Sequence, residues 1–390
     1  MNSFIVPLNV SQASISEVGG KGINLSRLIR AGFPVPPGFV ITTAAYHAFV
    51  DSNDLNAAIF ALVDDRIQSV EEISAAIRLR FEQANIPDNL SSAIVSAYIQ
   101  HFPTLANEAP VPVVARSSAT AEDLLGASFA GQHESFLNVC GEQELLRAVQ
   151  RCWSSLWTAR ALDYRSRKNI VPGSLGMAVV VQAMVPAQAA GVLFTVSPLS
   201  MSRDEMVIEA VWGLGESIVS GLTTPDHVII NRVTGAIKQI MVGDKAVMTA
   251  PVGSGTAERD VEARLRHTPV LSTSQVAELA TLGEAVEAHF GTPQDIEWCA
   301  ANGNFYIVQS RPITTLPPQT VHWESPIPDA KWQKDVQAAE WVIEPLSPLG
   351  ATTTLAAMVS ARQTMRTWPP VPKVRAPWST LMNGWFYQRV

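Results

Sequence analysis

The feature that most constrains the fold of this chain is a change of hydrophobic period at Val111. Before it, apolar residues recur at intervals of three and four within 59–81 and 90–100, which is typical of helices. After it, short β-branched or apolar runs stand between turn signals and predict strands, with a helical stretch over 145–164 among them. This mixture predicts an α/β or α+β fold, and we favour α+β. The expected strands cover 111–115, 135–139, 178–185, 191–195, 206–211 and 227–231.

The elements near residue 300 are predicted from their ends. Ser272-Thr273-Ser274 opens a helix that we expect to run to about Phe290, with Gly291 as its C-terminal stop. Asn302-Gly303 then predicts a hairpin between two strands.

After Thr314 the composition changes, because six of the ten tryptophans fall in the last 70 or so residues, beside a proline-rich stretch. We expect this segment to be the incomplete start of a further, helical domain or a tail packed on the main body.

Size and composition exclude several classes of protein. A chain of 390 residues with 47% hydrophobic residues can form two or three domains with their own cores, so disorder is excluded as its main state. Three scattered cysteines are too few for a disulfide framework and indicate reduced thiols in a cytoplasmic protein. A formal charge of −7 without a basic block argues against nucleic acid or anionic lipid as partners. The longest apolar run, 177–186, is too short to span a membrane.

The first of four clusters suited to binding phosphate is Gly19-Gly20-Lys21-Gly22. Apolar residues follow it at helical spacing, so it would place backbone N–H groups and one ammonium at a helix N-terminus, where the peptide dipoles favour an anion. It does not match the Walker A pattern. A glycine turn with a solvated lysine is therefore the alternative.

The second cluster, Arg116 to Asp123, directly follows an expected strand. An arginine at a strand end can bind phosphate oxygens bidentately, and the serine, threonine and glycine residues up to Gln132 could complete the binding site. A structural ion pair of Arg116 with Glu122 or Asp123 is the alternative.

The third cluster, 212–216, reads Trp-Gly-Leu-Gly-Glu after another strand. It allows close approach to a ligand or is a plain connection, and it lacks the third glycine of a dinucleotide fingerprint.

The fourth cluster lies on the two strands of the expected hairpin. With a three-residue loop, Glu297 faces Gln309 and Asp295 faces Arg311 on one side of the sheet, while Ile296, Trp298 and Val308 face the core. Carboxylates with an amide suit Mg²⁺, which prefers one or two carboxylates plus nucleotide phosphates. With a two-residue loop, Glu297 is no longer opposite Gln309. An exposed polar face with ordinary cross-strand pairs is the alternative.

Together these motifs resemble the N-terminal nucleotide-binding domain of the dikinases, namely phosphoenolpyruvate synthase, pyruvate phosphate dikinase and the rifampicin phosphotransferases. The resemblance extends from about Ser3 to Leu316, in the family's order and spacing. It implies an ATP-grasp-like fold of two subdomains, 1–172 and 173–317, with ATP between them. Residues 318–390 would be the incomplete Trp/Pro-rich start of a further domain. The motifs that carry the resemblance are 19–22, 114–123, 127–132, 212–216, 295–298 and 308–312.

The resemblance also implies roles for individual residues. Three cationic groups would neutralise phosphate charge during catalysis, and a glutamate and a glutamine would bind Mg²⁺ and ATP. Three more residues would contact the nucleotide, two of them in a glycine-containing phosphate loop. The cations are Lys21, Arg116 and Arg311, the metal-binding pair is Glu297 and Gln309, the phosphate-loop residues are Gly131 and Ser135, and the last contact is Gln182.

The expected activity follows from the same resemblance. In these relatives the β-phosphoryl group of ATP passes to a histidine on a swivelling domain and then to pyruvate or the antibiotic, and AMP and phosphate are released. No Thr-Ser-His-like motif occurs in this chain. We therefore expect the ATP-binding module of a dikinase-type phosphotransferase whose phosphohistidine domain lies outside the chain. An ADP-forming ATP-grasp ligase and a non-catalytic ATP-binding fragment are the alternatives.

Overall fold

The computed structural model of this chain divides into two compact units, Met1–Thr315 and Leu316–Val390. Most of the first unit is described, and three short strands of the second. The described residues are 3–10, 13–63, 69–104, 109–120, 134–168, 175–198, 200, 202–314, 316, 332–334, 379–382 and 385–389.

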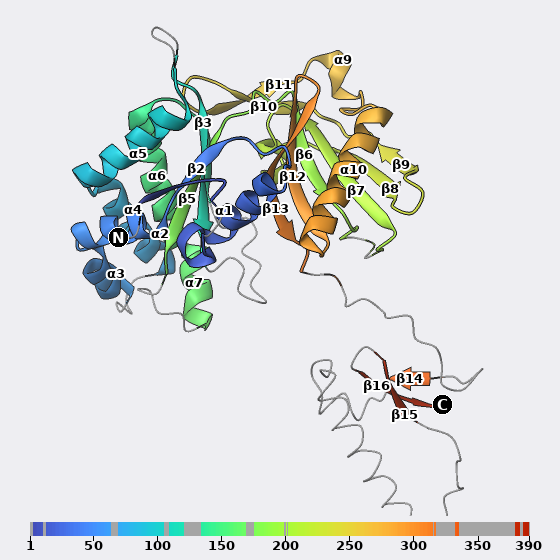
Figure 1. The fold of residues 1–390 in the computed structure, drawn as a ribbon, viewed down its shortest axis with the longest axis horizontal. Helices are drawn as coiled ribbons and strands as arrows, with labels where there is room; N and C mark the ends of the chain where they lie inside the picture. Colours follow the sequence, from blue (N-terminus) through green and yellow to red (C-terminus); the bar gives the residue numbers. More distant parts are fainter. Residues whose placement is uncertain are drawn as a thin grey trace, which may run out of the picture. The chain divides into compact units, whose positions relative to one another are not determined.

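Five antiparallel strands form the first sheet of the larger unit, in the order β1-β2-β5-β3-β4 (Figure 1). A large core between this sheet and its helices contains Trp153 and Trp157. The strands are β1 (Ile5–Pro7), β2 (Gly38–Ile41), β3 (Val113–Ala119), β4 (Ser135–Val139) and β5 (Met177–Ala183). The helices are α2 (Thr43–Ser52), α3 (Leu55–Val63), α4 (Val70–Gln83), α5 (Asp88–His101), α6 (Glu142–Ser154) and α7 (Ala159–Lys168), with a 3₁₀ turn at Ser155–Trp157.

Six antiparallel strands form the second sheet, in the order β13-β12-β6-β7-β8-β9. Helix α10 (Thr273–Phe290) packs on one face through Val276, Leu279 and Val286. It begins at a capping box on Ser272 and ends at Gly291 with φ 72°, so both predicted ends are confirmed. The strands are β6 (Ala189–Phe194), β7 (Glu205–Trp212), β8 (Asp226–Asn231), β9 (Ile237–Met241), β12 (Gln294–Ala301) and β13 (Asn304–Pro312). The remaining elements are α8 (Glu216–Val219), α9 (Ala263–Arg266) and the hairpin β10 (Val247–Pro251)–β11 (Thr256–Asp260).

Helix α1 (Ile15–Arg30) lies between the two sheets (Figure 1). Leu25 packs in a small core with residues of β2 and β5, whereas Leu28, one turn later, belongs to the core under the second sheet. The side chain of Asn24 donates a hydrogen bond of 3.2 Å to the backbone oxygen of Ser310 on β13. Residues three and four apart share a helix face, so this helix can hold both halves of the unit together.

The mixed helices and sheets agree with the predicted α+β class, and each strand expected from the sequence is present. Strands β1, β2 and β9 to β11 were not predicted. The strand that follows the expected boundary at 172/173 is β5, and it pairs with β2 and β3 inside the first sheet. The chain therefore passes to the second sheet only after Ala183. The ATP-grasp-like architecture stays a prediction.

The smaller unit is described only by a three-stranded sheet, β14-β16-β15. Its strands are β14 (Trp332–Lys334), β15 (Ser379–Met382) and β16 (Trp385–Arg389). The helices expected over 318–390 fall on residues outside the described ones. Within the described parts of the chain, no helix has both the length and the apolar character needed to cross a membrane.

Candidate functional site

The two halves of the larger unit meet at an ion pair between Arg116 and Glu297. Arg116 lies on β3 of the first sheet, and its Nη1 donates a hydrogen bond of 2.9 Å to Oε2 of Glu297 on β12 of the second. The arginine side chain is 12% exposed and the glutamate 34%. The Nε of Arg116 is buried and has no hydrogen-bond partner within the described residues. A guanidinium with a buried, unused donor is suited to a further oxygen ligand.

A kink in α1 brings Lys21 to β3, the strand that carries Arg116. Gly19 has φ 67°, and a Cβ atom there would lie 2.2 Å from the backbone oxygen of Ser118, so only glycine fits. The Ser118 hydroxyl donates to Val18 O (2.9 Å) and accepts from Gly22 N (3.2 Å). The expected anion-binding helix start is therefore partly occupied, because Ser118 takes one of its amides.

The ammonium of Lys21 donates a hydrogen bond of 2.8 Å to the backbone oxygen of Ser117. Ser117 follows Arg116 directly on β3. The structure thus brings two of the three predicted cations to the same strand.

The hairpin β12–β13 combines both registers considered from the sequence. Its loop has two residues, Asn302 and Gly303, with φ 53° and 78°, as in a type I′ turn. Near the turn Trp298 pairs with Ile307, but the register then shifts by one residue at a bulge, and Glu297 pairs with Gln309. The bulge therefore restores the predicted polar face. The expectation that Val308 faces the core is wrong, because Ile307 is the fully buried residue opposite Trp298.

Beyond the bulge, Asp295 pairs with Arg311 as predicted. The guanidinium donates from Nε (2.9 Å) and Nη2 (2.7 Å) to the same carboxylate oxygen, Oδ2. Burial raises the pKa of Asp295 above the ordinary aspartate value of 3.8, and Arg311 only partly opposes this rise. The pair is therefore one in which desolvation of the carboxylate outweighs its stabilisation by the neighbouring cation.

The remaining predicted contacts lie on the first sheet or outside the described residues. Ser135 opens β4 directly opposite Arg116. Gln182, on β5, is buried, and its amide donates 3.2 Å to Pro36 O. Gly131 lies outside the described residues, as do Glu122 and Asp123, the structural partners considered for Arg116.

Two polar residues that the sequence did not single out continue the same face of the second sheet. Glu297 pairs with Val192, Val192 with Glu209, and Glu209 with His227. Directly paired residues of adjacent strands share a face, so Glu209 and His227 face the same side as Glu297. His227 Nδ1 lies 3.6 Å from Glu209 Oε1. No regular alternation of polar and apolar residues marks them in the sequences of β7 (EMVIEAVW) and β8 (DHVIIN), so they follow only from the pairing of the strands.

The glycine turn at 212–216 approaches a strand. Gly213 has φ 73°, and a Cβ atom there would lie 2.5 Å from Thr249 O on β10. Leu214 N donates to the same oxygen at 3.0 Å. The glycine is therefore explained by the close approach of β10.

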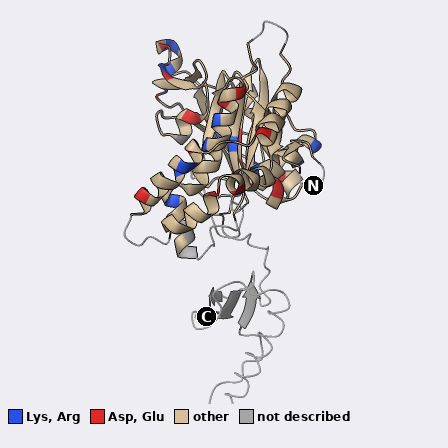
Figure 2. Ribbon diagram, turned by 90° about the vertical axis from the view of Figure 1, so that its left-hand side faces the viewer, with Lys and Arg blue, Asp and Glu red and all other residues tan. Residues whose placement is uncertain are grey.

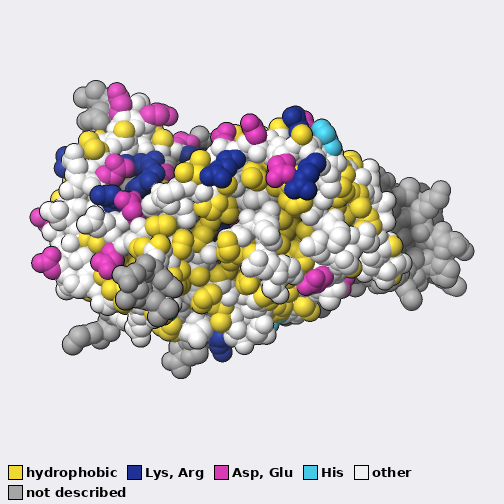
Figure 3. Space-filling view, turned by 90° about the horizontal axis from the view of Figure 1, so that it is seen from above, with side chains coloured by type: hydrophobic (Ala, Val, Ile, Leu, Met, Phe, Trp, Pro, Cys, Tyr) yellow, Lys and Arg dark blue, Asp and Glu magenta, His cyan; other side chains and the backbone are white. Residues whose placement is uncertain are grey.

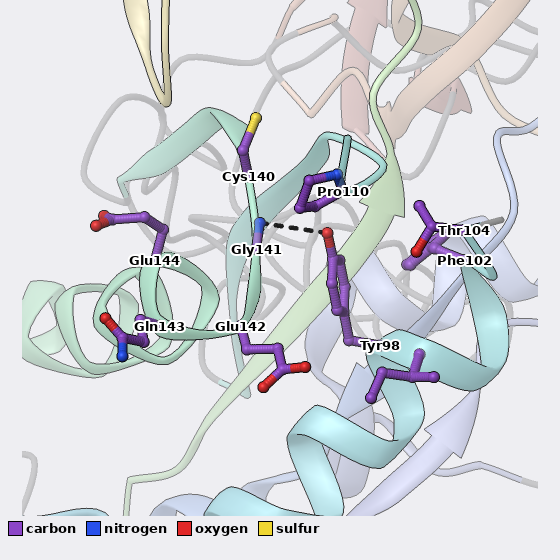
Figure 4. Close-up of a pocket in the computed structure, with 10 residues that line it drawn as sticks. Tyr98, Phe102, Thr104, Pro110, Cys140, Gly141, Glu142, Gln143 and Glu144 are labelled. Carbon is purple, nitrogen blue, oxygen red and sulfur yellow. Dashed lines mark hydrogen bonds between the residues drawn. The ribbon is translucent and has the colours of Figure 1, made fainter. Parts of the chain in front are cut away.

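A cavity of about 470 Å³ lies elsewhere, between α5 and the start of α6 (Figure 4). Tyr98 and Gly141 line it and are joined by a hydrogen bond of 3.3 Å from the Gly141 amide to the Tyr98 hydroxyl. None of the predicted site residues lines this cavity.

Lys and Arg are interspersed with Asp and Glu along the ribbon of the larger unit, and basic and acidic side chains also lie together on its upper face (Figures 2 and 3).

The donor set around Glu297 fits a magnesium ion held mainly by a nucleotide. No group of three or more His, Cys, Asp or Glu side chains suited to a metal occurs within the described residues. Glu297 and Gln309 would supply one carboxylate and one amide oxygen from paired positions. Mg²⁺ is commonly bound by one or two carboxylates together with substrate phosphates and water, so this small set is sufficient.

Comparison with known proteins gives a consistent result. The family model described as "Pyruvate phosphate dikinase, AMP/ATP-binding domain" matches residues 15–328. A probable phosphoenolpyruvate synthase of Methanothermobacter thermautotrophicus is 41% identical over 302 residues, which cover 76% of this chain and 44% of that protein. A rifampicin phosphotransferase of a Streptomyces species is 41% identical over 315 residues, covering 80% and 36%. The phosphoenolpyruvate synthase of Pyrococcus furiosus is 36% identical over 382 residues, covering 86% and 46%. The chain thus spans less than half the length of these relatives.

Proposed function

Because this chain belongs to the family of the pyruvate phosphate dikinase AMP/ATP-binding domain, we propose that it binds Mg·ATP at the junction of the five-stranded and six-stranded sheets of its larger unit. The observation that supports the proposal is the hydrogen bond between Arg116 and Glu297, because it joins the proposed phosphate-binding cation to the proposed metal ligand. Lys21 lies next to the same strand, and Gln309 lies opposite Glu297.

Nucleotide binding at this junction requires an exchange of partners. Arg116 would leave Glu297 and bind phosphate oxygens through the fork of its guanidinium, for which its buried Nε provides an unused donor. Glu297 and Gln309 would then hold the magnesium ion, which screens the phosphate charge. In this proposal, contacts with the nucleotide and the metal would replace the ion pair between Arg116 and Glu297.

Phosphoryl transfer depends mainly on positioning and on electrostatic stabilisation of the phosphate oxygens. Lys21 and Arg116 would neutralise charge from the side of the first sheet. Arg311 would do so from the second, and Asp295 orients its guanidinium through two hydrogen bonds. Ser135, Gly131 and Gln182 are proposed as further nucleotide contacts.

We further propose that the β-phosphoryl group goes to a histidine of a domain outside this chain, so that AMP and phosphate are the overall nucleotide products. Two facts support this. The relatives named phosphoenolpyruvate synthase or rifampicin phosphotransferase are more than twice as long as the part that this chain covers. The chain itself contains no Thr-Ser-His-like motif. Pyruvate and a rifamycin-type antibiotic are the two candidate final acceptors.

The test has two stages. Calorimetry with Mg·ATP should show one binding site, and Arg264→Ala, an exposed arginine on α9, should bind as the wild type does. Incubation with ATP labelled at the β-phosphoryl and the phosphohistidine domain of a relative should then label that domain and produce AMP. ADP as the only nucleotide product would point to a ligase-type reaction, and the absence of Mg·ATP binding would overturn the proposal.

A further inference from the structure

The turn of the β10–β11 hairpin connects the second half of the larger unit to the edge strand of the first sheet. The side-chain amide of Asn138, on β4, donates to Gly253 O (2.9 Å) and to Gly255 O (2.7 Å). The backbone amide of Cys140 donates to the Ser254 hydroxyl at 3.1 Å. These three hydrogen bonds therefore join the end of β4 and the residue that follows it to one short turn, more than 110 residues later in the chain.

The base of the same hairpin is attached to the second half. Thr249 O on β10 accepts a hydrogen bond of 3.0 Å from Leu214 N, directly after β7. Thr256 on β11 donates 2.9 Å to Glu216 Oε2 at the start of α8. We call residues 247–260 the strap, because they are bonded to the second half at the base and to β4 at the tip.

Asn138 has the conformation and the chemistry that this contact needs. It is 5% exposed and has φ 55°, a left-handed conformation that asparagine adopts more readily than most residues. Its amide N–H groups face two carbonyl oxygens, an arrangement that an aspartate could not provide. Cys140 lines the cavity beside Tyr98 (Figure 4), and its Sγ lies 3.7 Å from Gly253 O at the same contact.

The strap is hydrogen-bonded to β4, which pairs with β3, the strand that carries Arg116. Ser135, three residues before Asn138 on β4, pairs directly with Arg116 on β3. We infer that Asn138 is a positioning residue, and that the strap it anchors holds the Arg116 half against the Glu297 half before a nucleotide binds. The effect on ATP rests on the proposed function, whereas the coupling of the two halves does not.

Preorganisation sets the expected effect on binding. With the strap in place, the two halves are already aligned, so less binding free energy is spent on ordering them. Without it, Mg·ATP must bring the halves together at its own cost. Loss of the Asn138 contacts should therefore weaken Mg·ATP binding about threefold to tenfold, comparable to the loss of about one hydrogen bond.

The first experiment measures the strap without any nucleotide. Asn138→Gly keeps the left-handed backbone and removes the amide, and Asn138→Asp keeps the shape but places a carboxylate against two carbonyl oxygens. In both variants hydrogen exchange of the Cys140 amide and of β10–β11 should be at least about tenfold faster, while exchange in α10 should stay as in the wild type. Unchanged exchange at Cys140 in both variants would overturn the inference.

The second experiment restores the contact by another bond. Ser254→Cys would bring a second thiol beside Cys140, whose backbone nitrogen is 3.1 Å from the present hydroxyl. In the double variant Asn138→Gly/Ser254→Cys, oxidation should form the cross-link and return the Mg·ATP dissociation constant to the wild-type value, and reduction should weaken binding again. A purely structural role for Asn138 predicts no such redox-dependent recovery.

The outcomes separate this inference from the proposed function. The inference about the strap would be overturned if the cross-link failed to form, or if Asn138→Gly bound Mg·ATP with wild-type affinity. Failure of the wild-type chain to bind Mg·ATP would instead overturn the proposed function, and hydrogen exchange at Cys140 would still decide whether the strap couples the halves.

Discussion

Arg116 on β3 and Glu297 on β12 form a hydrogen bond of 2.9 Å although 181 residues separate them in the chain. Each residue belongs to a different sheet, so their contact depends on how the two halves are aligned. Each also has a second proposed use, phosphate for the arginine and magnesium for the glutamate. With both proposed uses, the pair would couple alignment of the halves to occupation of the proposed site.

Replacing Glu297 should have opposite effects on ATP with and without magnesium. Glu297→Gln removes the charge that holds Arg116, so metal-free ATP should bind about twofold to fivefold more tightly, as expected when an ion pair no longer competes. Magnesium should then add little to the affinity, because the carboxylate that would hold it is gone. Calorimetry with ATP at millimolar Mg²⁺ and in EDTA measures both effects. A variant that keeps the full magnesium dependence would contradict this role of Glu297.

Removing Arg116 should affect the chemical step more than folding. In Arg116→Ala, phosphoryl transfer to an added phosphohistidine domain should fall about 10²–10³-fold, as when one preorganised donor to a developing charge is lost. The same loss is expected for Arg311→Ala. Single-turnover transfer from labelled ATP measures the rate, and Arg264→Ala on α9 is the matched control. An unchanged rate in Arg116→Ala would remove this arginine from the proposed mechanism.

Local signals in the sequence were sufficient for individual elements. The serine cap and the glycine stop of α10 act on groups within a few residues, so both ends could be predicted. The turn at Asn302-Gly303 was predicted for the same reason. The roles of the eight proposed nucleotide and metal residues stay predictions.

Features that depend on distant partners could not be predicted in the same way. The bulge beside Trp298 changes the register inside β13, and a pairing rule based on the loop alone gives either the turn or the polar face, but not both. The bond between Asn138 and Gly253 joins segments 115 residues apart, and no local pattern marks it. The assignment of β5 to the first sheet is a further long-range result.

The kink of α1 gives a prediction about stability with a built-in control. A side chain at Gly19 would meet Ser118 O at 2.2 Å and adopt a positive φ, whereas Gly32 also has a positive φ but has nothing within 4 Å of its Cβ position. Gly32→Ala should therefore cost only the backbone term, about 1–2 kcal/mol, and Gly19→Ala clearly more, because α1 must also move away from β3. Urea unfolding measures both. Equal costs would show that the close approach at Ser118 relaxes freely.

Asp295 leads to a prediction about the pH dependence of stability. Burial raises its pKa in the folded chain above the ordinary value of 3.8, so the folded state holds the proton more tightly than the unfolded state does. The contribution of this group to stability is therefore greatest below that ordinary value and is lost as the pH rises through the raised pKa. Asp295→Asn keeps an oxygen that can accept from Arg311 but cannot titrate, so this dependence disappears. The free energy of unfolding of the wild type should therefore fall relative to that of Asp295→Asn as the pH rises from about 4 towards 7.

Chemical unfolding of both proteins at several pH values checks the sign, because all other titrating groups are shared. A control is Asp244→Asn, where hydrogen bonds and charge from Arg266 lower the pKa of an exposed aspartate. There the stabilisation by the carboxylate is present above 3.8 and lost as the pH falls through the lowered value, so the wild type should gain on Asp244→Asn as the pH rises. If Asp295→Asn gave the same sign as Asp244→Asn, the ion pair with Arg311 would outweigh desolvation at Asp295. Arg311 would then be held more firmly than proposed, and less available to a phosphate.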